Sequence, residues 1–281
     1  MTKRGHEAIA DALAKSSGAG FIPFLSAGDP DEETSFQLLT QLATFSSVIE
    51  VGIPYSDPLA DGPVIQEGSL RALKQGMTFQ KALQLIARVR QVTDVPIVVF
   101  TYANPVVSFG AKALADACAK AGADGVIVPD LPHEEADELR QALTARGIAL
   151  IPLVSLTSGD RIETIARAAS GFIYCVSSLG VTGERKGFSH DLRAFVERVR
   201  KSSSVPVAVG FGVSQPEQVR ELSAYTDGIV VGSALVKRCA AIADAKQKGD
   251  AAALREQNEL IAFAKSLAAI AGGEKARDPH A

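Results

Sequence analysis

Short apolar runs that alternate with longer amphipathic stretches are the feature that most limits how this 281-residue chain can fold. The segments between the runs place apolar residues at i, i+3 and i+4 spacing, which indicates helices. Strands that alternate with helices predict a parallel sheet. Eight runs rich in β-branched residues predict strands, and they cover residues 20–26, 47–52, 96–102, 124–130, 148–154, 171–177, 205–211 and 227–233.

The number and spacing of these units favour one closed barrel. Eight β/α units in about 210 residues match a (β/α)8 (TIM) barrel in both count and size. A doubly wound open sheet has the same local patterns and is the alternative, but the repeat shows no odd edge strand. We therefore predict an α/β fold with a single (β/α)8 TIM barrel over residues 1–270. An extra N-terminal helix should cover 2–15, a C-terminal closing helix 253–271, and residues 271–281 should form a flexible tail.

Composition narrows the class of function. The chain is 47% hydrophobic and carries a net charge of −3 with mixed signs, which gives no electrostatic reason to expect a nucleic-acid partner. Its first residues lack the apolar core of a secretory signal, and no run approaches the roughly 18 apolar residues of a membrane helix. Three dispersed cysteines suit a reduced cytoplasmic enzyme, and four dispersed histidines show no metal-ligand spacing. We expect no metal site and no membrane partner.

Two acidic residues in the stretch VIEVGIPYSDPLADGP (48–63) are the strongest catalytic candidates. Glu50 interrupts an apolar strand, and either face of a barrel strand is enclosed, so burial should raise its pKa towards neutrality. Such a carboxyl can donate and accept protons near pH 7. Asp61 lies in the loop that leaves this strand. A structural salt bridge for Glu50 and an ordinary turn for Asp61 are the alternatives, but two carboxylates reaching one pocket is a more specific arrangement.

Three glycine-bearing segments follow the last three predicted strands: GVTG (180–183), GFG (210–212) and GS (232–233). Glycine lets backbone N–H groups approach an anion, and a helix that begins at Ser233 would add a favourable dipole. TIM barrels commonly bind phosphate with the loops after strands seven and eight. No lysine or arginine lies within GFG or GS, which indicates one small phosphate group.

Aromatic side chains at strand ends suggest a planar, apolar group at the other end of the ligand. Core packing explains any one of them equally well, but four at one face of the barrel favour a pocket. These residues are Phe21, Tyr102, Tyr174 and Phe211.

Together these segments resemble one family, the tryptophan synthase alpha subunit. The similar motifs occur in the family's order and cover about residues 5–268. They are FIPFLSAGDP (21–30), IEVGIPYSDPLADGPVIQ (49–66), YANPV (102–106), PDLP (129–132), GVTG (180–183), GFG (210–212) and VVGSALV (230–236).

The resemblance implies a lyase that cleaves indole-3-glycerol phosphate to indole and glyceraldehyde 3-phosphate by a retro-aldol reaction. It implies that Glu50 is the acid/base residue and Asp61 the second catalytic carboxylate, and that 180–188 forms a lid. No cofactor is implied in this subunit. By the same resemblance, phosphate contacts fall on Gly183, Gly212, Gly232 and Ser233, and pocket contacts on Phe21, Tyr174, Thr182 and Phe211.

The family also implies a partner, a pyridoxal-phosphate-dependent beta subunit that receives indole through a tunnel in an α2β2 heterotetramer. The segments that match the contact regions contain several prolines. Exposed at the barrel mouth, these prolines fit a protein interface, but they equally fit rigid turns. The implied contact residues are Pro54, Asp57, Pro58, Asn104 and Pro105.

Other functions share many of these features. A stand-alone lyase that releases free indole would have nearly all the motifs and would need no partner for high activity. A non-catalytic phosphosugar-binding subunit would not need Glu50 and Asp61 together. A Schiff-base aldolase would need a lysine within a barrel strand, and none of the eight predicted strands contains one.

Overall fold

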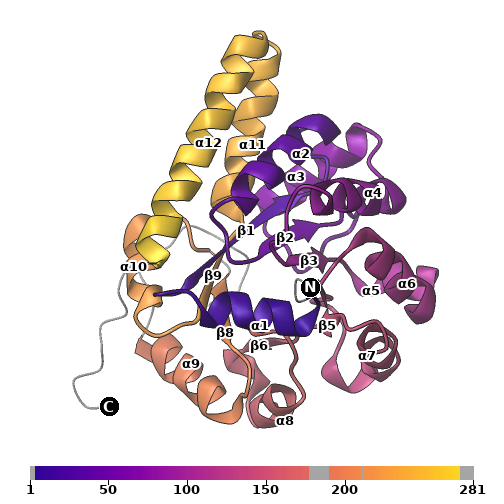
Figure 1. The fold of residues 1–281 in the computed structure, drawn as a ribbon, viewed down its shortest axis with the longest axis vertical. Helices are drawn as coiled ribbons and strands as arrows, with labels where there is room; N and C mark the ends of the chain where they lie inside the picture. Colours follow the sequence, from indigo (N-terminus) through magenta and orange to yellow (C-terminus); the bar gives the residue numbers. More distant parts are fainter. Residues whose placement is uncertain (1–3, 177–189, 211, 273–281) are drawn as a thin grey trace.

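A computed structural model describes residues 4–176, 190–210 and 212–272, and it shows a closed parallel barrel surrounded by helices (Figure 1). Each adjacent pair of strands runs parallel, in the order β5-β4-β3-β2-β1-β9-β8-β7-β6. The strands are β1 (Gly20–Ser26), β2 (Ile49–Gly52), β3 (Ile97–Phe100), β4 (Gly125–Ile127), β5 (Ala149–Leu150), β6 (Leu153–Ser155), β7 (Ile173–Val176), β8 (Val207–Gly210) and β9 (Gly228–Val231).

The two terminal strands of that order, β5 and β6, are consecutive parts of one barrel strand. β5 pairs with β4 and β6 pairs with β7, so the connection between them closes the sheet. The two intervening residues keep the ladder continuous, because the Ile151 N–H donates to the Val126 carbonyl at 2.9 Å and the Pro152 carbonyl accepts from the Tyr174 N–H at 3.0 Å. The prediction of eight barrel strands is confirmed, with the fifth divided at Pro152, which has no N–H to donate.

A ring of helices covers the outside of the barrel (Figure 1). The connection after β2 holds two helices, and the periodicity analysis did not single out the first of them, α3. Helices α11 and α12 form a long pair that projects beyond the barrel. The helices of this ring are α2 (Glu32–Ala43), α3 (Pro63–Lys74), α4 (Phe79–Arg90), α5 (Ala103–Phe109), α6 (Ala111–Ala121), α7 (Asp137–Thr144), α8 (Arg161–Arg167), α9 (His190–Ser202), α10 (Pro216–Ser223), α11 (Ser233–Lys246) and α12 (Asp250–Ala271), with 3-10 turns η1 (His133–Glu135) and η2 (Leu156–Ser158).

The predicted N-terminal helix is α1 (His6–Ala14), and it closes the amino-terminal end of the barrel. The Gly5 N–H, just before the helix, donates to the buried Asp124 carboxylate at 2.7 Å. Ile9 and Leu13 on its apolar face are fully buried among the side chains that fill the barrel interior. Because this end is plugged, a ligand site inside the barrel must open at the carboxyl ends of the strands.

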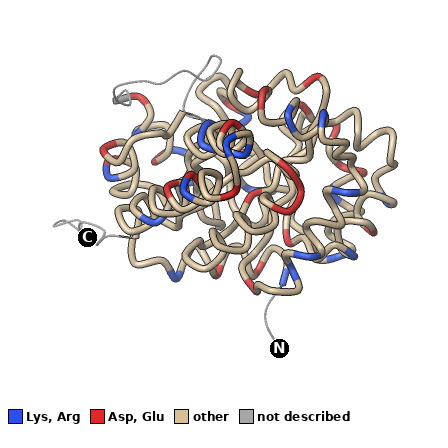
Figure 2. The backbone as a smooth tube through the Cα atoms, turned by 90° about the horizontal axis from the view of Figure 1, so that it is seen from above, with Lys and Arg blue, Asp and Glu red and all other residues tan. Residues whose placement is uncertain are grey.

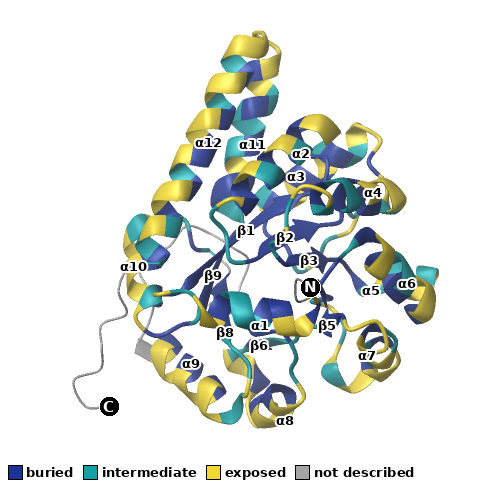
Figure 3. Cartoon of the chain, in the orientation of Figure 1, coloured by how far each residue is buried: buried dark blue, intermediate teal, exposed yellow. Residues whose placement is uncertain are grey.

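Strand alternation divides the core into two layers. Ile22 and Phe24 point into the barrel, whereas Phe21 and Leu25 face the helices. The strands are largely buried, with partly exposed residues in β5, β6 and β7, and the exposed residues lie mainly on the outer helix surfaces (Figure 3). Positive and negative residues are interspersed along the backbone (Figure 2). Within the described ranges, no helix is long and apolar enough to cross a membrane.

Candidate active site

Glu50 lies on β2 and points into the barrel. It is in register with Phe24 of β1 and Val98 of β3. Only 1% of its surface is exposed, and its Oε2 has no hydrogen-bond partner among the described residues. Burial, reinforced by the negative charge of Asp61, raises the pKa of the Glu50 carboxyl to about 8. Glu50 is therefore protonated at neutral pH and can act as an acid.

Asp61 lies in the loop between β2 and α3, and the surrounding backbone holds it in place. Its N–H donates to the Pro58 carbonyl at 3.0 Å, and its carbonyl accepts from the side-chain amide of Gln66 at 2.9 Å. Burial raises the pKa of its carboxyl to about 6, and the adjacent Tyr102 hydroxyl, although outside good hydrogen-bond geometry, opposes that shift. Asp61 is therefore mostly ionised at pH 7 while Glu50 is protonated.

Both carboxylates line one hollow inside the carboxyl end of the barrel. Its volume is about 40 Å³, far below the roughly 300 Å³ or more of typical small-molecule sites. A bulky ligand must therefore widen it. The described lining residues are Phe24, Glu50, Asp61, Gly62, Ile65, Phe100, Tyr174, Gly212, Val230, Gly232 and Ser233.

Two glycines make room for the aromatic rings of this hollow. A Cβ on Gly52 would lie 2.6 Å from the ring of Phe24, and a Cβ on Gly210 would lie 2.2 Å from the hydroxyl of Tyr174. Phe24 also packs edge-to-face against Phe100. The glycines thus let two rings fill the barrel beside the carboxylates.

The structure corrects the expectation for Phe21. Its side chain faces the helix layer and stacks on Phe45, with ring centroids 6.2 Å apart. Phe24, which the sequence analysis missed, lines the hollow instead, because residues three apart on a strand point to opposite faces. Phe24 pairs in register with Glu50 on the neighbouring strand, and this pairing identifies Phe24 as the residue that faces the hollow. Tyr174 lines the hollow as expected, and Tyr102 lies in the same interior cluster.

Three predicted phosphate contacts come together in the same hollow. Gly212, Gly232 and Ser233 all line it, and Gly212 has a φ of 91°, which favours glycine. Helix α11 begins at Ser233 without a side-chain cap, and the first amides of a helix have no partner within it. This end of α11 suits an anion. The other expected contacts, Gly183, Thr182 and Phe211, and the lid 180–188 lie outside the described residues.

The predicted interface residues divide into exposed and buried positions. Asp57 and Asn104 are exposed, and Pro58 and Pro105 are partly exposed, but Pro54 is buried, so the expectation of an exposed proline there is wrong. The Asn104 side chain donates to the Tyr55 hydroxyl at 2.8 Å and so joins the two segments. Two side chains that sequence reasoning missed are strongly exposed beside them: Leu59 at 82% and Val107 at 77%.

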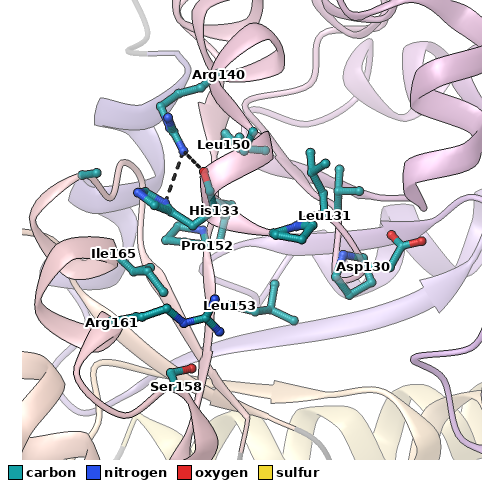
Figure 4. A pocket seen from close by; sticks show the side chains of 16 residues that line it. Asp130, Leu131, His133, Arg140, Leu150, Pro152, Leu153, Ser158, Arg161 and Ile165 are labelled. Atoms are coloured by element: carbon teal, nitrogen blue, oxygen red, sulfur yellow. Dashed lines mark hydrogen bonds between the residues drawn. The ribbon is translucent and has the colours of Figure 1, made fainter.

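A larger hollow of about 280 Å³ lies away from the carboxylates, between α7, α8 and the β5–β6 strand (Figure 4). Its walls include Leu131, Pro152 and Ile165. Both of its guanidinium groups already have partners, since Arg140 is bound to Asp137 and His133, and Arg161 lies 3.3 Å from Glu134. In the described part of the chain, no three His, Cys, Asp or Glu side chains are placed to hold a metal ion.

Comparison with known proteins gives the same family as the motifs. The family model described as "Tryptophan synthase alpha chain" matches residues 10–265. The tryptophan synthase alpha chain of Shouchella clausii is 46% identical over 93% of this chain and 98% of its own length, and that of Geobacillus kaustophilus is 49% identical over 89% and 93%. Among solved structures, tryptophan synthase of Mycobacterium tuberculosis has a TM-score of 0.83 at 33% identity, covering 96% of this chain and 99% of that one. A mutant alpha subunit from Pyrococcus furiosus has a TM-score of 0.77 at 34% identity, over 89% of this chain and 98% of that one. This chain therefore belongs to the tryptophan synthase alpha chain family.

Proposed function

We propose that Glu50 carries out the proton transfers of indole-3-glycerol phosphate cleavage and that Asp61 stabilises the positive charge that develops during it. The chain is a carbon–carbon lyase of tryptophan biosynthesis, which converts this substrate to indole and glyceraldehyde 3-phosphate. The observation that carries the residue assignment is the pair of buried carboxyls in one hollow, with pKa values of about 8 and about 6. At pH 7 one is an acid and the other an anion, as this reaction requires.

Glu50 acts first as an acid and then as a base. It protonates C3 of the indole ring, which gives an electrophilic indolenine cation. The proton of the side-chain hydroxyl next to C3 then passes to the Glu50 carboxylate as the C–C bond breaks. The bonding electrons return to the ring to give indole, and the hydroxyl carbon becomes the aldehyde of glyceraldehyde 3-phosphate. Glu50 ends protonated, as it began, so no net proton is consumed.

Asp61 stabilises the cation that forms in the first step. Its carboxylate accepts a hydrogen bond from the indole N–H, where positive charge develops, in a pocket largely closed to water. Ionised Asp61 also disfavours ionisation of Glu50 and so keeps the acid protonated. We assign Phe24, Phe100 and Tyr174 to the indole ring, because they line the hollow beside the two carboxylates.

The phosphate binds at the start of α11. Backbone amides of Gly212, Gly232 and Ser233 and the Ser233 hydroxyl are the groups we assign to it, together with Gly183. These contacts hold substrate and transition state equally, so they govern binding more than turnover. By resemblance, we assign Thr182 and Phe211 to contacts with the substrate and 180–188 to the lid that closes over it.

A beta subunit is the partner we propose, in an α2β2 heterotetramer that passes indole between sites, with pyridoxal phosphate held by the partner and no cofactor in this chain. The exposed side chains Leu59 and Val107 support an interface at the barrel mouth, since large apolar side chains exposed on neighbouring segments often mark a protein contact. The hydrogen bond from Asn104 to Tyr55 joins the two segments that carry them. Asp57 and Pro58 belong to the same surface, and Pro54 supports it from beneath.

We further propose a single catalytic domain over residues 1–270 that works in the cytoplasm, with 271–281 as a tail. The three cysteines are free and buried, which suits a reducing compartment.

Indole release from indole-3-glycerol phosphate tests the proposal. Trp is absent from the chain, so indole fluorescence can be followed with little background from this subunit. We expect slow release by the chain alone and faster release with a beta subunit, and we expect Glu50→Gln and Asp61→Asn to abolish most turnover while phosphate binding persists. Fast release without a partner would instead favour a stand-alone lyase. Near-normal turnover by Asp61→Asn would disprove its assigned role.

A further inference from the structure

A buried ion pair joins the loop after β1 to helix α3. Arg71 donates from Nε to Asp29 Oδ1 and from Nη2 to Asp29 Oδ2, each at 2.9 Å. Asp29 is fully buried, and the Arg71 side chain is 23% exposed. Such a two-point contact fixes orientation as well as distance, because the planar guanidinium matches the carboxylate edge. Neither residue lines the catalytic hollow.

The same arginine also contacts the helix that we assign to the phosphate. Arg71 Nη2 donates to the Val236 carbonyl at 3.3 Å, in the first turns of α11. Gly68, one turn before Arg71, packs closely on Val236, since a Cβ there would lie 2.6 Å from a Val236 methyl and 2.9 Å from Asp29 Oδ2. Arg71 therefore ties α3 to α11 and to the loop after β1 at one point.

Helix α3 in turn holds the catalytic loop. It begins at Pro63, two residues after Asp61, and the Gln66 side chain donates to the Asp61 carbonyl at 2.9 Å. A shift or rotation of α3 would therefore move Asp61. The phosphate-binding end belongs to α11, so the position of Asp61 relative to a bound substrate depends on how these two helices are held together.

We propose that Arg71 and Asp29 are positioning residues for the lyase reaction, which fix α3, and with it Asp61, relative to the phosphate-binding end of α11. This inference rests on the proposed roles of Asp61 and of α11. It predicts that loosening the pair lowers the rate of the chemical step, because a misplacement of about 1 Å can cost about 100-fold in rate. Binding of the phosphate group alone should change little, because its contacts come from α11 and the glycine loops.

The chain offers a matched control at the other end of the barrel. Arg90 Nη2 donates to Asp124 Oδ2 at 2.6 Å, and Asp124 is 1% exposed. Asp124 directly precedes β4 and also accepts from the N–H groups of Gly5 and Ile97, so this pair braces the plugged, amino-terminal end. Both pairs join a buried aspartate to a largely buried arginine, although Arg90 contacts its aspartate through one nitrogen and directs its other donors to backbone carbonyls. Positions at that end of a TIM barrel serve stability, whereas the carboxyl end serves catalysis.

The experiment compares Arg71→Lys with Arg90→Lys, and Asp29→Asn with Asp124→Asn, in the full chain with its beta subunit. Lysine keeps the charge but loses the several hydrogen bonds of the guanidinium, which include the two-point contact in the case of Arg71, and asparagine keeps the shape but loses the charge. For each variant, kcat and KM for indole-3-glycerol phosphate, inhibition by glycerol 3-phosphate, and Tm are measured, with assays well below the lowest Tm. Glu50→Gln serves as the reference for loss of the acid.

We expect all four variants to lose thermal stability, but only Arg71→Lys and Asp29→Asn to lower kcat, by about 10- to 100-fold. Their inhibition constants for glycerol 3-phosphate should stay within about threefold of the unaltered chain. Equal kcat losses in both pairs, or no loss in the Asp29–Arg71 pair, would overturn the inference. If Glu50→Gln also kept full activity, the catalytic assignment itself would fail, and the two failures would be distinguished.

Discussion

The pH dependence of kcat/KM should be bell-shaped around neutrality. The active form has Glu50 protonated and Asp61 ionised, and these carboxyls have pKa values of about 8 and about 6. At pH 7 about nine-tenths of each group is in the required state, so about 80% of the enzyme is active. At pH 5 only about one-tenth of Asp61 is ionised, and at pH 9 only about one-tenth of Glu50 is protonated. The rate should therefore fall about ninefold on each side.

The alkaline limb has a specific cause that a variant can test. The negative charge of Asp61 is the second contribution, after burial, to the raised pKa of Glu50. Asp61→Asn removes that charge, so the alkaline limb of its residual activity should move to lower pH, although burial still keeps the pKa of Glu50 above its usual range.

Initial rates of indole release at low substrate, measured between pH 4.5 and pH 9.5, test both expectations. The substrate phosphate itself titrates near pH 6, so inhibition by glycerol 3-phosphate over the same range serves as the control. A profile that falls only below about pH 4, with no alkaline limb, would show that both carboxyls behave as exposed groups. The argument from burial would then be refuted.

Three further substitutions follow from the same geometry. Because the folded-state pKa of Glu50 lies above its unfolded value, the free energy of unfolding falls as pH rises from about 4.5 to about 8. Glu50→Gln removes this loss, which amounts to a few kcal/mol, so the variant should have a higher Tm than the unaltered chain at pH 8 but not at pH 4. The same Tm difference between Glu50→Gln and the unaltered chain at pH 4 and pH 8 would contradict this expectation. Leu59→Glu should weaken binding of the beta subunit at least about tenfold by calorimetry, whereas Val92→Glu, also at an exposed apolar side chain, should not. Gly210→Ala places a methyl 2.2 Å from the Tyr174 hydroxyl, so it should lower kcat/KM with little effect on inhibition by glycerol 3-phosphate. Equal losses in kcat/KM and in affinity for glycerol 3-phosphate would place the damage at the phosphate site.

The fold could be predicted from the sequence because most barrel strands are buried on both faces. Each strand is therefore a short apolar run, and the helices between them show a distinct period. The division of 149–155 into β5 and β6 was not predictable from hydrophobicity, since Ile151 and Pro152 continue the apolar run. Nor was α3, which begins in a loop of prolines and glycines, because the residues it buries include Gly68 and Ser69, which carry little hydrophobic signal.

The two candidate carboxylates, which line one hollow, could be identified from the sequence for a different reason. A glutamate inside an apolar strand violates the pattern around it, and such local violations occur at functional sites. Phe21 was assigned wrongly because position near a strand end was used without the parity of the strand. Pro54 was expected at the surface because composition does not distinguish a buried turn from an exposed one. Leu59 and Val107 were missed because exposure is a property of the folded chain, and nothing in a single apolar residue marks it.

The arrangement of Glu50 also explains why the site lies inside the barrel and not on a loop above it. An exposed glutamate has a pKa near 4.5 and would be ionised at pH 7, unable to protonate a carbon. Raising that pKa requires burial, and burial leaves the Glu50 Oε2 without a partner among the described residues, at a cost in folding free energy. A rigid strand with packed neighbours on both sides can hold such a group in place, whereas a loop would turn it towards water. Asp61 needs the opposite property, ionisation, and accordingly sits on the loop, where burial is less complete and raises its pKa only to about 6, with the Tyr102 hydroxyl opposing that rise. The strand and its loop thus give two similar carboxyls different charges at the same pH.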